Sequence, residues 1–395
     1  MIYFDNAATT CVFPEVVEAM QDAMQVTYGN PSAKHMKGIE AENKVKAAQE
    51  LIAKTLRAKP KEILFTSGGT ESNNTAIIGT AMANRRKGKH IITTKVEHAS
   101  VYEPMYHLEE EGYEVTYLDV DSEGIVDLDQ LEESIREDTI LVSCMMVNNE
   151  IGVIEPIEEI AKIIKAKNPN TIFHVDAIQA YGKLPIVPKN MGIDLLSTSG
   201  HKIHGPKGIG FLYIKEGTKI SPIIFGGGQQ KGMRSGTENV PAIMGMAAAL
   251  KDAVEHLEEN AAKVSALRDR LIEGLSKIPH SSLNGDSLNR LPGNVSFCFE
   301  GIEGESLLLL LDQKGICASS GSACTSGSLD PSHVLLAIGR PHEIAHGSLR
   351  LSLCETNTEE EVDYMLEEIP KVVEYLRNMS PLWKDKAEGK KKFVL

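Results

Sequence analysis

The sequence is poor in cysteine, in long apolar runs and in positive charge. Its six cysteines are spread over 395 residues, without the dense spacing of a small disulfide-bonded domain. No apolar run reaches the roughly 18 residues of a membrane-spanning helix. The N-terminus MIYFDNAATT lacks the basic and apolar regions of a signal peptide. We therefore expect a cytoplasmic protein with free thiols that does not enter a membrane.

The charge balance is acidic. Lys and Arg number 41 against 55 Asp and Glu, which gives a formal net charge of −14. This balance disfavours a broad nucleic-acid-binding surface, so we expect no direct nucleic-acid partner. Apolar residues make up 42% and charged residues 24% of the chain, as in ordinary folded proteins, and the length allows two domains.

Short β-rich runs alternate with amphipathic helical segments through the first two-thirds of the chain. This alternation predicts an α/β fold with a mostly parallel seven-stranded sheet and helices on both faces. The loop between the last two runs is too short for a helical crossover, so we expect that pair of strands to be antiparallel. The expected strands cover residues 62–66, 90–94, 114–120, 139–147, 171–177, 194–199 and 209–215.

The pattern changes after the glycine-rich residues 223–240. A long helix over 241–278 and a later mixture of strands and helices predict a smaller α+β domain. The later elements are expected at 294–300 (strand), 305–313 (helix), 347–353 (strand) and 358–378 (helix).

These patterns predict two domains. We assign residues 14–253 to the large domain, and residues 1–13 with 254–395 to the small one. The charged C-terminal sequence KDKAEGKKKFVL is expected to be a solvated, frayed tail.

Lys202 follows an expected strand in the sequence STSGHKIHGPKGIG, residues 197–210. Open α/β sheets bind ligands at the carboxyl ends of their strands, and glycines let the backbone approach a ligand closely. A lysine held in such a pocket can form a Schiff base, whereas most lysines are surface charges. Lys207 is the alternative candidate, although a GPKG turn would direct its side chain to solvent.

Asp176 ends an apolar run in FHVDAIQA, residues 173–180. An unpaired carboxylate is costly to bury there, so it needs a cationic partner or hydrogen-bond donors. The protonated ring nitrogen of pyridoxal phosphate is one such partner, and a structural ion pair or helix cap is the alternative. An Asp at the end of one strand and Lys202 at the end of the next fit that cofactor.

Two further strand ends carry polar residues. In LFTSGGTESNN, Gly69 and Thr70 open an expected helix whose free backbone N–H groups could hold a phosphate, although any tight turn can use Gly-Gly-Thr. His98 follows another strand in KVEHAS, where a lone histidine is more often structural than catalytic. Signals at four successive strand ends together indicate one ligand site.

Cys324 lies in SSGSACTSGSLDP, among small polar residues that offer no apolar surface to pack it. A cysteine in such a loop is expected to be exposed and mobile, which suits a reactive thiol. The other five cysteines are expected to be structural, with Cys144 and Cys298 in the core and Cys11, Cys317 and Cys354 near strand edges or the N-terminal segment.

The order of these motifs resembles that of the NifS-type cysteine desulfurases, pyridoxal-phosphate-dependent members of the class-V aminotransferase family. The similarity extends from Asp5 to about Leu382, and the form SSGSAC resembles the first group of these enzymes. The motifs are DNAATT (5–10), YGNPS (28–32), SGGTESNN (67–74), VEHAS (96–100), VNNEIGV (147–153), HVDAIQA (174–180), SGHKIHGPKGIG (199–210), RSGTEN (234–239), SSGSACTSG (319–327) and GSLRLSL (347–353).

The resemblance implies a fold-type-I transferase that converts L-cysteine to L-alanine. The sulfur would be carried as a persulfide on Cys324 to an acceptor protein. Lys202 would hold the cofactor and shuttle the Cα proton, and His98 would stack on its ring and assist proton transfer. The other implied cofactor ligands are Asp176 (ring nitrogen), Gln179 (ring hydroxyl), and Gly69, Thr70, Ser199, His201 and Thr237 (phosphate).

The resemblance also implies a homodimer, because Thr237 would reach the phosphate from the second subunit. Arg350 would bind the substrate carboxylate, together with Asn148 or the adjacent Asn149. No metal site is expected.

Three questions stay open from the sequence. The acceptor could be an iron–sulfur scaffold, a tRNA-thiolating enzyme or a sulfur carrier, because the ending KKKFVL differs from the C-terminal segment of family members that feed such a scaffold. Selenocysteine could also be a substrate. The competing functions are another fold-type-I enzyme such as an aminotransferase, which gives Cys324 no role, and a non-catalytic sulfur relay, which gives none to Lys202 and Asp176.

Overall fold

A seven-stranded sheet forms the larger part of the molecule in the computed structural model, which describes residues 1–320 and 331–395. The strand order is β2-β8-β7-β6-β5-β3-β4. Only β8 runs against its neighbours in this sheet, so the predicted mostly parallel sheet and its antiparallel final pair are both confirmed. The strands are β2 (Ile63–Thr66), β3 (His90–Thr94), β4 (Glu114–Leu118), β5 (Thr139–Met145), β6 (Ile172–Asp176), β7 (Leu195–Ser197) and β8 (Gly210–Ile214).

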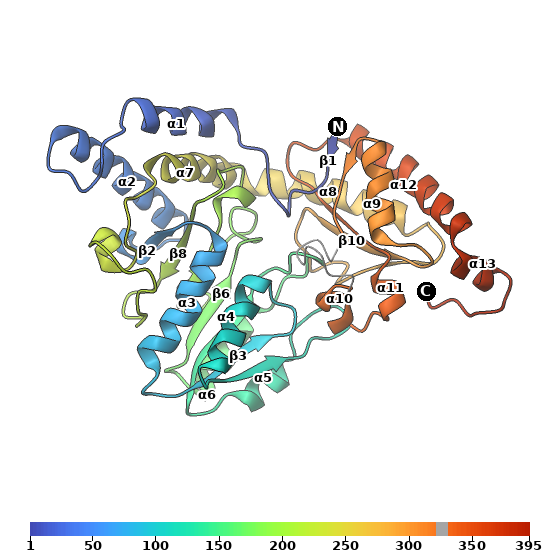
Figure 1. Ribbon diagram of the computed structural model, residues 1–395, viewed down its shortest axis with the longest axis horizontal. Helices are drawn as coiled ribbons and strands as arrows, with labels where there is room; N and C mark the ends of the chain where they lie inside the picture. Colours follow the sequence, from blue (N-terminus) through green and yellow to red (C-terminus); the bar gives the residue numbers. More distant parts are fainter. Residues whose placement is uncertain (321–330) are drawn as a thin grey trace.

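Helices cover both faces of this sheet, as predicted, and the strands are apolar on both sides for that reason. Successive residues such as Leu195 and Leu196 are buried in different cores, one on each face. In Figure 1, α3 (Gly69–Asn84) and α4 (Ala99–Glu110) lie in front of the strands. The opposite core receives α1 (Pro14–Gln25), α2 (Met36–Thr55), α5 (Leu128–Ser134), α6 (Ile157–Lys167) and α7 (Val240–Glu255).

A second core forms around a three-stranded antiparallel sheet, in the order β12-β10-β9. Its separateness supports the division into two domains, whose boundaries stay a prediction. The strands are β9 (Ser281–Leu283), β10 (Asn294–Phe299) and β12 (Ser348–Ser352), with a parallel pair β1 (Ile2–Tyr3) and β11 (Ile316–Cys317). The helices are α8 (Leu257–Leu275), α9 (Gly304–Gln313), α10 (His333–Ala337), α11 (His342–Ala345), α12 (Glu359–Met379) and α13 (Pro381–Ala387), and short 3-10 turns are η1 (Pro60–Glu62), η2 (Gly200–Lys202) and η3 (Gln229–Gly232).

The helix expected over 241–278 is two helices, α7 and α8, which meet at His256. The backbone there leaves the helical region, with φ −111° and ψ 14°. The buried side chains of α7 pack in the core of the large sheet, whereas those of α8 pack in the second core. The break lets one amphipathic stretch turn its apolar face from one core to the other, which a helical periodicity alone does not reveal.

The expectation of a frayed C-terminal tail is wrong. Lys386 is buried and forms ion pairs with Glu300 and, at 3.1 Å, with Glu343. The Phe393 ring stacks on His280 with centroids 3.8 Å apart, and the backbone N–H of Leu395 donates to Glu300 at 2.9 Å. One charged residue of the tail, Lys386, is therefore compensated by the buried Glu300, which lies far away in the sequence, whereas Lys390 pairs with Asp385 and Glu388 within the tail.

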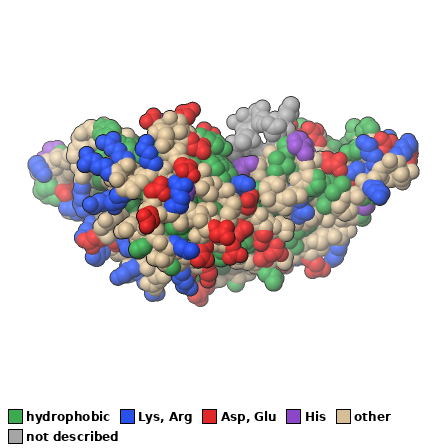
Figure 2. Space-filling view, turned by 90° about the horizontal axis from the view of Figure 1, so that it is seen from below, with side chains coloured by type: hydrophobic (Ala, Val, Ile, Leu, Met, Phe, Trp, Pro, Cys, Tyr) green, Lys and Arg blue, Asp and Glu red, His purple; other side chains and the backbone are tan. Residues whose placement is uncertain are grey.

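The surface mixes charges of both signs. Figure 2 shows Lys and Arg side chains on the end of the molecule that carries α1 and α2, and acidic side chains across the middle of this face. Among the described residues, none of the helices is long and apolar enough to cross a membrane. The five described cysteines are free, and Cys144 and Cys298 are buried as expected.

Candidate functional site

The carboxyl ends of several strands of the large sheet open on one cavity of about 310 Å³. Residues after β2, β3, β5, β6 and β7 line it, together with the N-terminal segment and Arg350 of β12. Nine predicted site residues meet in this lining: Gly69, Thr70, His98, Asp176, Gln179, Ser199, His201, Lys202 and Arg350.

Asp176 is the last residue of β6 and is almost fully buried. Its Oδ1 accepts a hydrogen bond from the Ile178 N–H at 3.0 Å, and its Oδ2 accepts one from Asn73 Nδ2 at 2.8 Å. Burial raises the pKa of the Asp176 carboxyl, and these hydrogen bonds only partly offset that effect. A cationic group in the cavity would therefore be strongly favoured beside this carboxylate.

Asn73 and Ser100 connect Asp176 to His98, and sequence reasoning did not identify either as a site residue. Asn73 Nδ2 also donates to Ser100 Oγ at 2.8 Å, and Ser100 Oγ lies 2.9 Å from His98 Nδ1. The Ser100 N–H donates to the same His98 Nδ1 at 3.0 Å, so a neutral His98 carries its hydrogen on Nε2. Burial lowers the pKa of His98, which favours this neutral form. Both residues lie inside quoted motifs, but only the fold brings them together.

Lys202 lies in the short turn η2 after β7, and its ammonium is held by the N-terminal segment. Nζ donates to the carbonyl oxygens of Ala7 at 2.5 Å and Ala8 at 2.8 Å. Lys207 is exposed and lines only an adjoining hollow, not the cavity that Lys202 and Asp176 line. The geometry therefore favours Lys202 over Lys207 as the amine of the site.

The start of α3 forms one wall of that adjoining hollow. Gly68, at the N-cap, has φ 145° and no side-chain cap, so the first N–H groups of the helix have no capping side chain. A Cβ on Gly69 would lie 2.2 Å from Ile178 Cδ1, so any larger residue there would force the Ile178 side chain to move. Backbone N–H groups at the N-terminus of a 16-residue helix are well suited to bind a phosphate.

Ser199 and His201 line both the cavity and the hollow. Burial, assisted by nearby Lys202, lowers the pKa of His201 to about 4, so the ring is neutral near pH 7. Its Nδ1 lies 3.2 Å from Thr9 Oγ1.

Two buried polar atoms of the cavity lining have no partner among the described residues. One is Gln179 Oε1, whose amide nitrogen donates to the Ala7 carbonyl oxygen at 3.0 Å. The other is Arg350 Nε, although Nη1 donates to the Asn149 carbonyl oxygen and Nη2 pairs with Asp5. Buried polar atoms of this kind are normally hydrogen-bonded, so both indicate a bound polar ligand.

Asn148 lies outside the cavity lining, whereas Asn149 is part of it. The Asn148 side chain is fully used: Nδ2 donates to the Val96 carbonyl oxygen at 2.9 Å, and Oδ1 accepts from the N–H groups of Glu150 and Ile151. The geometry therefore favours the alternative, Asn149, as the residue that faces a ligand.

Two predicted residues are not in this lining. Thr237 is exposed on the segment between β8 and α7, and Cys324 lies outside the described residues. The chain on either side of 321–330 lies close to the site: Ser319 exchanges backbone hydrogen bonds with Arg350, at 2.7 and 3.2 Å. On the other side, the Ser332 hydroxyl donates to the buried Glu150 carboxylate.

These observations fit pyridoxal phosphate, the cofactor implied by the resemblance. The buried Asp176 carboxylate suits the protonated ring nitrogen, and the unpartnered Gln179 Oε1 suits the ring hydroxyl. The uncapped start of α3 suits the phosphate. The cavity and its adjoining hollow thus offer a site for each polar part of the cofactor, together with an amine, Lys202, that can hold it.

Comparison with known proteins identifies the family of the chain. The class-V aminotransferase profile matches residues 2–365. A protein of Methanosarcina thermophila named cysteine desulfurase IscS is 55% identical over 381 residues, which cover 96% of this chain and 94% of that protein. One of Clostridium botulinum with the same name is 52% identical over 392 residues, 98% of either chain. A solved structure titled NifS-like protein superposes with a TM-score of 0.90 at 43% identity, covering 95% of this chain and all of that one. The chain therefore belongs to the class-V aminotransferases, a pyridoxal-phosphate-dependent family, and within it to the cysteine desulfurases.

Proposed function

We propose that the protein is a cysteine desulfurase that converts L-cysteine to L-alanine and carries the sulfur as a persulfide on Cys324. The observation that carries this proposal is the single cavity in which Lys202, the buried Asp176 carboxylate and the Arg350 guanidinium converge. Curated relatives that share half of the sequence over nearly its full length bear the name cysteine desulfurase, which supports it further.

The chain's own residues hold the cofactor in a fixed orientation. Asp176 takes the ring nitrogen and Gln179 the ring hydroxyl, while Lys202 Nζ is the amine that holds the cofactor covalently. Gly69, Thr70, Ser199 and His201 bind the phosphate. Bound there, pyridoxal phosphate supplies an electron sink that makes the Cα proton of an amino acid removable.

Other residues of the cavity bind and handle the substrate. Arg350 Nε, which has no protein partner among the described residues, donates to the substrate carboxylate, and Asn149 lies beside it. Lys202 Nζ takes the proton from Cα and returns it. His98, held neutral by its contacts with Ser100, packs against the ring face and assists the transfer.

Cys324 accepts the sulfur. Its thiolate attacks the sulfur of the bound substrate, a sulfur–sulfur bond forms, and the carbon–sulfur bond of the substrate breaks. The electron pair of the broken bond stays with the substrate carbon, which takes up a proton and leaves as part of L-alanine. The backbone hydrogen bonds between Ser319 and Arg350 support this role, because they hold one end of the segment that carries Cys324 beside the arginine proposed to bind the substrate carboxylate.

Replacing Cys324 with Ala tests this assignment. We expect the variant to keep the cofactor absorbance and to respond to added cysteine by a spectral change, because Lys202 and Asp176 are untouched. It should release no alanine in catalytic amounts and carry no extra sulfur by mass spectrometry. Cys317→Ala, in β11 and outside the cavity lining, is the matched control and should turn over normally. Normal alanine production by Cys324→Ala, or extra sulfur on Cys317, would refute the mechanism.

The same experiment separates the competing functions. An aminotransferase would consume an amino acid in Cys324→Ala as fast as in the wild type. A non-catalytic relay would show no cofactor absorbance and could not be reconstituted with pyridoxal phosphate. Release of selenide and alanine from selenocysteine would extend the substrate range without changing the assignment.

We further propose that the enzyme is a cytoplasmic homodimer. The free state of the five described cysteines supports a reducing compartment. Thr237 is exposed, and Phe225 of the same connection between β8 and α7 is 75% exposed, so this segment suits a subunit interface across which Thr237 reaches the partner's phosphate site. The sulfur acceptor is an iron–sulfur scaffold, a tRNA-thiolating enzyme or a sulfur carrier, and capture with the persulfide form of the enzyme would identify it.

A further inference from the structure

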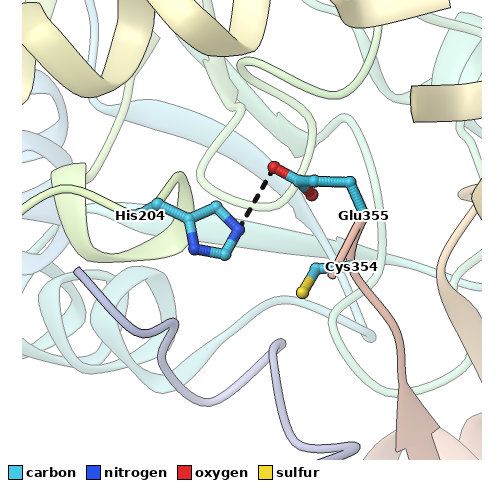
Figure 3. Close-up of side chains that lie close together, drawn as sticks. All are labelled: His204, Cys354 and Glu355. Carbon is cyan, nitrogen blue, oxygen red and sulfur yellow. Dashed lines mark ion pairs between the residues drawn. The ribbon is translucent and has the colours of Figure 1, made fainter. Parts of the chain in front are cut away.

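Three side chains of the metal-ligating type meet outside the catalytic cavity. Figure 3 shows His204, Cys354 and Glu355 directed toward one another, from two segments that are far apart in the sequence. His204 follows η2, and the other two follow β12. Their ligand atoms all lie within 4.8 Å of one another, and His204 and Cys354 are buried. We refer to these three residues as the His204 cluster.

The environment of His204 fixes which ring nitrogen faces the cluster. Nδ1 lies 2.8 Å from the Cys11 carbonyl oxygen, which can only accept, so Nδ1 carries a hydrogen. The ring is also stacked on Phe13, with centroids 4.0 Å apart and planes 6° apart. Nε2 of a neutral ring then presents a lone pair to Cys354 and Glu355. Metal-bound histidines are commonly oriented in this way, by a carbonyl on the other ring nitrogen.

The Nε2 atom lies 3.3 Å from Glu355 Oε1. Two lone pairs would repel at this distance, so a positive charge must lie between the atoms, either a proton or a metal ion. In a tetrahedral zinc site with Zn–N and Zn–O bonds near 2.0–2.1 Å, the N and O ligand atoms are about 3.3 Å apart. The observed separation thus equals that of two ligands of one tetrahedral ion.

The remaining features of the cluster also suit a dication. A Cys354 thiolate and a Glu355 carboxylate together carry two negative charges, which a divalent ion neutralises. The Thr356 hydroxyl lies 3.1 Å from Cys354 Sγ, where it can donate to a thiolate. The cluster borders a cavity of about 50 Å³, which has room for a water molecule as fourth ligand.

We propose that His204, Cys354 and Glu355 bind a divalent transition-metal ion, with Zn²⁺ as the best chemical match. A thiolate and an imidazole favour zinc over magnesium or calcium, which prefer oxygen ligands. The ion joins the turn that carries Lys202 to the end of β12, and so ties the large sheet to the second core.

Metal titration of the chelator-treated, cofactor-loaded enzyme tests the proposal. Co²⁺ is the probe, because tetrahedral thiolate coordination gives visible bands at longer wavelengths than the cofactor. Reactive Cys324 could also bind metal, so the titration uses Cys324→Ala as background. We expect one Co²⁺ per chain and its displacement by Zn²⁺. Zn²⁺ should also raise the melting temperature, because the ion binds only the folded protein.

Substitutions in the cluster should abolish that behaviour. Cys354→Ser and His204→Asn should weaken Co²⁺ binding by roughly 100-fold or more. This loss exceeds the roughly 10- to 100-fold typical of replacing a residue that only orients a metal ligand. Asn suits the left-handed backbone of His204, whose φ is 61°. Cys317→Ser is the matched control and should bind as the background does. If a buried variant misfolds, Glu355→Gln, at the most exposed position of the three, provides the same test.

Two results would overturn the proposal. One is the absence of stoichiometric binding in the Cys324→Ala background, which would leave a His204–Glu355 ion pair or metal on Cys324 as the explanation. The other is an equal affinity for Co²⁺ in the Cys324→Ala protein with and without the additional Cys354→Ser substitution.

Discussion

Asn73 should be essential for efficient catalysis although it does not line the cavity. Its Nδ2 donates both to Asp176 Oδ2 and to Ser100 Oγ, and the latter holds His98. Asn73→Ala removes both bonds. The Asp176 carboxylate keeps the N–H of Ile178 but loses its only side-chain donor among the described residues, while burial continues to favour its protonated form.

The size of the effect follows from these two bonds. A hydrogen bond to a charged group contributes about 1.5–3 kcal/mol, and each 1.36 kcal/mol corresponds to about tenfold in rate. We therefore expect kcat for alanine formation to fall by roughly 10- to 150-fold, with a smaller change in KM for cysteine. The protein should lose about 1 kcal/mol of stability, because the better helix propensity of Ala partly offsets the lost bonds.

The matched control is Asn84→Ala, in the same helix. Asn84 is also buried, and its amide donates to the backbone carbonyls of Thr80 and Lys219 at 3.0 and 3.1 Å, away from the site. It should lose comparable stability and keep its kcat. The assay measures alanine at saturating cysteine and cofactor, with urea unfolding alongside. If Asn73→Ala retains kcat within twofold of the wild type, the proposed role of this network is incorrect.

Two further predictions concern stability and assembly. Burial raises the pKa of Glu155 to about 8 in the folded protein. The protonated carboxyl therefore contributes its full stability below pH 4.5, near its pKa in the unfolded chain, and this contribution is lost as the pH rises towards 8. Glu155→Gln lacks this loss and should gain stability relative to the wild type between pH 5 and pH 8, by on the order of 1.4 kcal/mol per pH unit; a pH-independent difference in urea unfolding would contradict this. Mixed dimers of Lys202→Ala and Thr237→Val subunits should regain activity, because one of their two sites carries neither lesion; proven subunit exchange without recovery would exclude the shared site.

The strand-end residues were predictable because local sequence and sheet geometry agree there. Parallel strands place their carboxyl ends at one edge, so polar residues after β2, β3, β6 and β7 had to lie near each other. Which of two asparagine side chains, Asn148 or Asn149, faces the cavity was not predictable in the same way. Asn148 and Asn149 are adjacent in one turn, and only its folded path assigns the first to backbone hydrogen bonds and the second to the cavity.

Features that depend on long-range pairing were missed. The charged tail is docked because Glu300 and Glu343 offer partners to Lys386, and no local pattern contains that information. The His204 cluster was missed for the same reason, since its three residues lie in two distant segments without metal-ligand spacing. Cys354 was expected to be structural, and its burial agrees with that. Its position beside His204 also suits the metal-binding role proposed above.

The N-terminal segment DNAATT explains how a stretch without catalytic side chains belongs to the site. The Ala7 carbonyl oxygen accepts from both Gln179 Nε2 and Lys202 Nζ, and the Thr10 hydroxyl accepts from the His204 N–H at 2.8 Å. These contacts use mainly the backbone, so the small side chains at positions 7 and 8 serve chiefly to let the chain pass close to Lys202. The same segment continues to Cys11, whose carbonyl orients His204. This one segment, which turns at residues 6–8, thus sets the position of the Lys202 amine and the orientation of the His204 ring, because it lies between them and offers carbonyl oxygens to both.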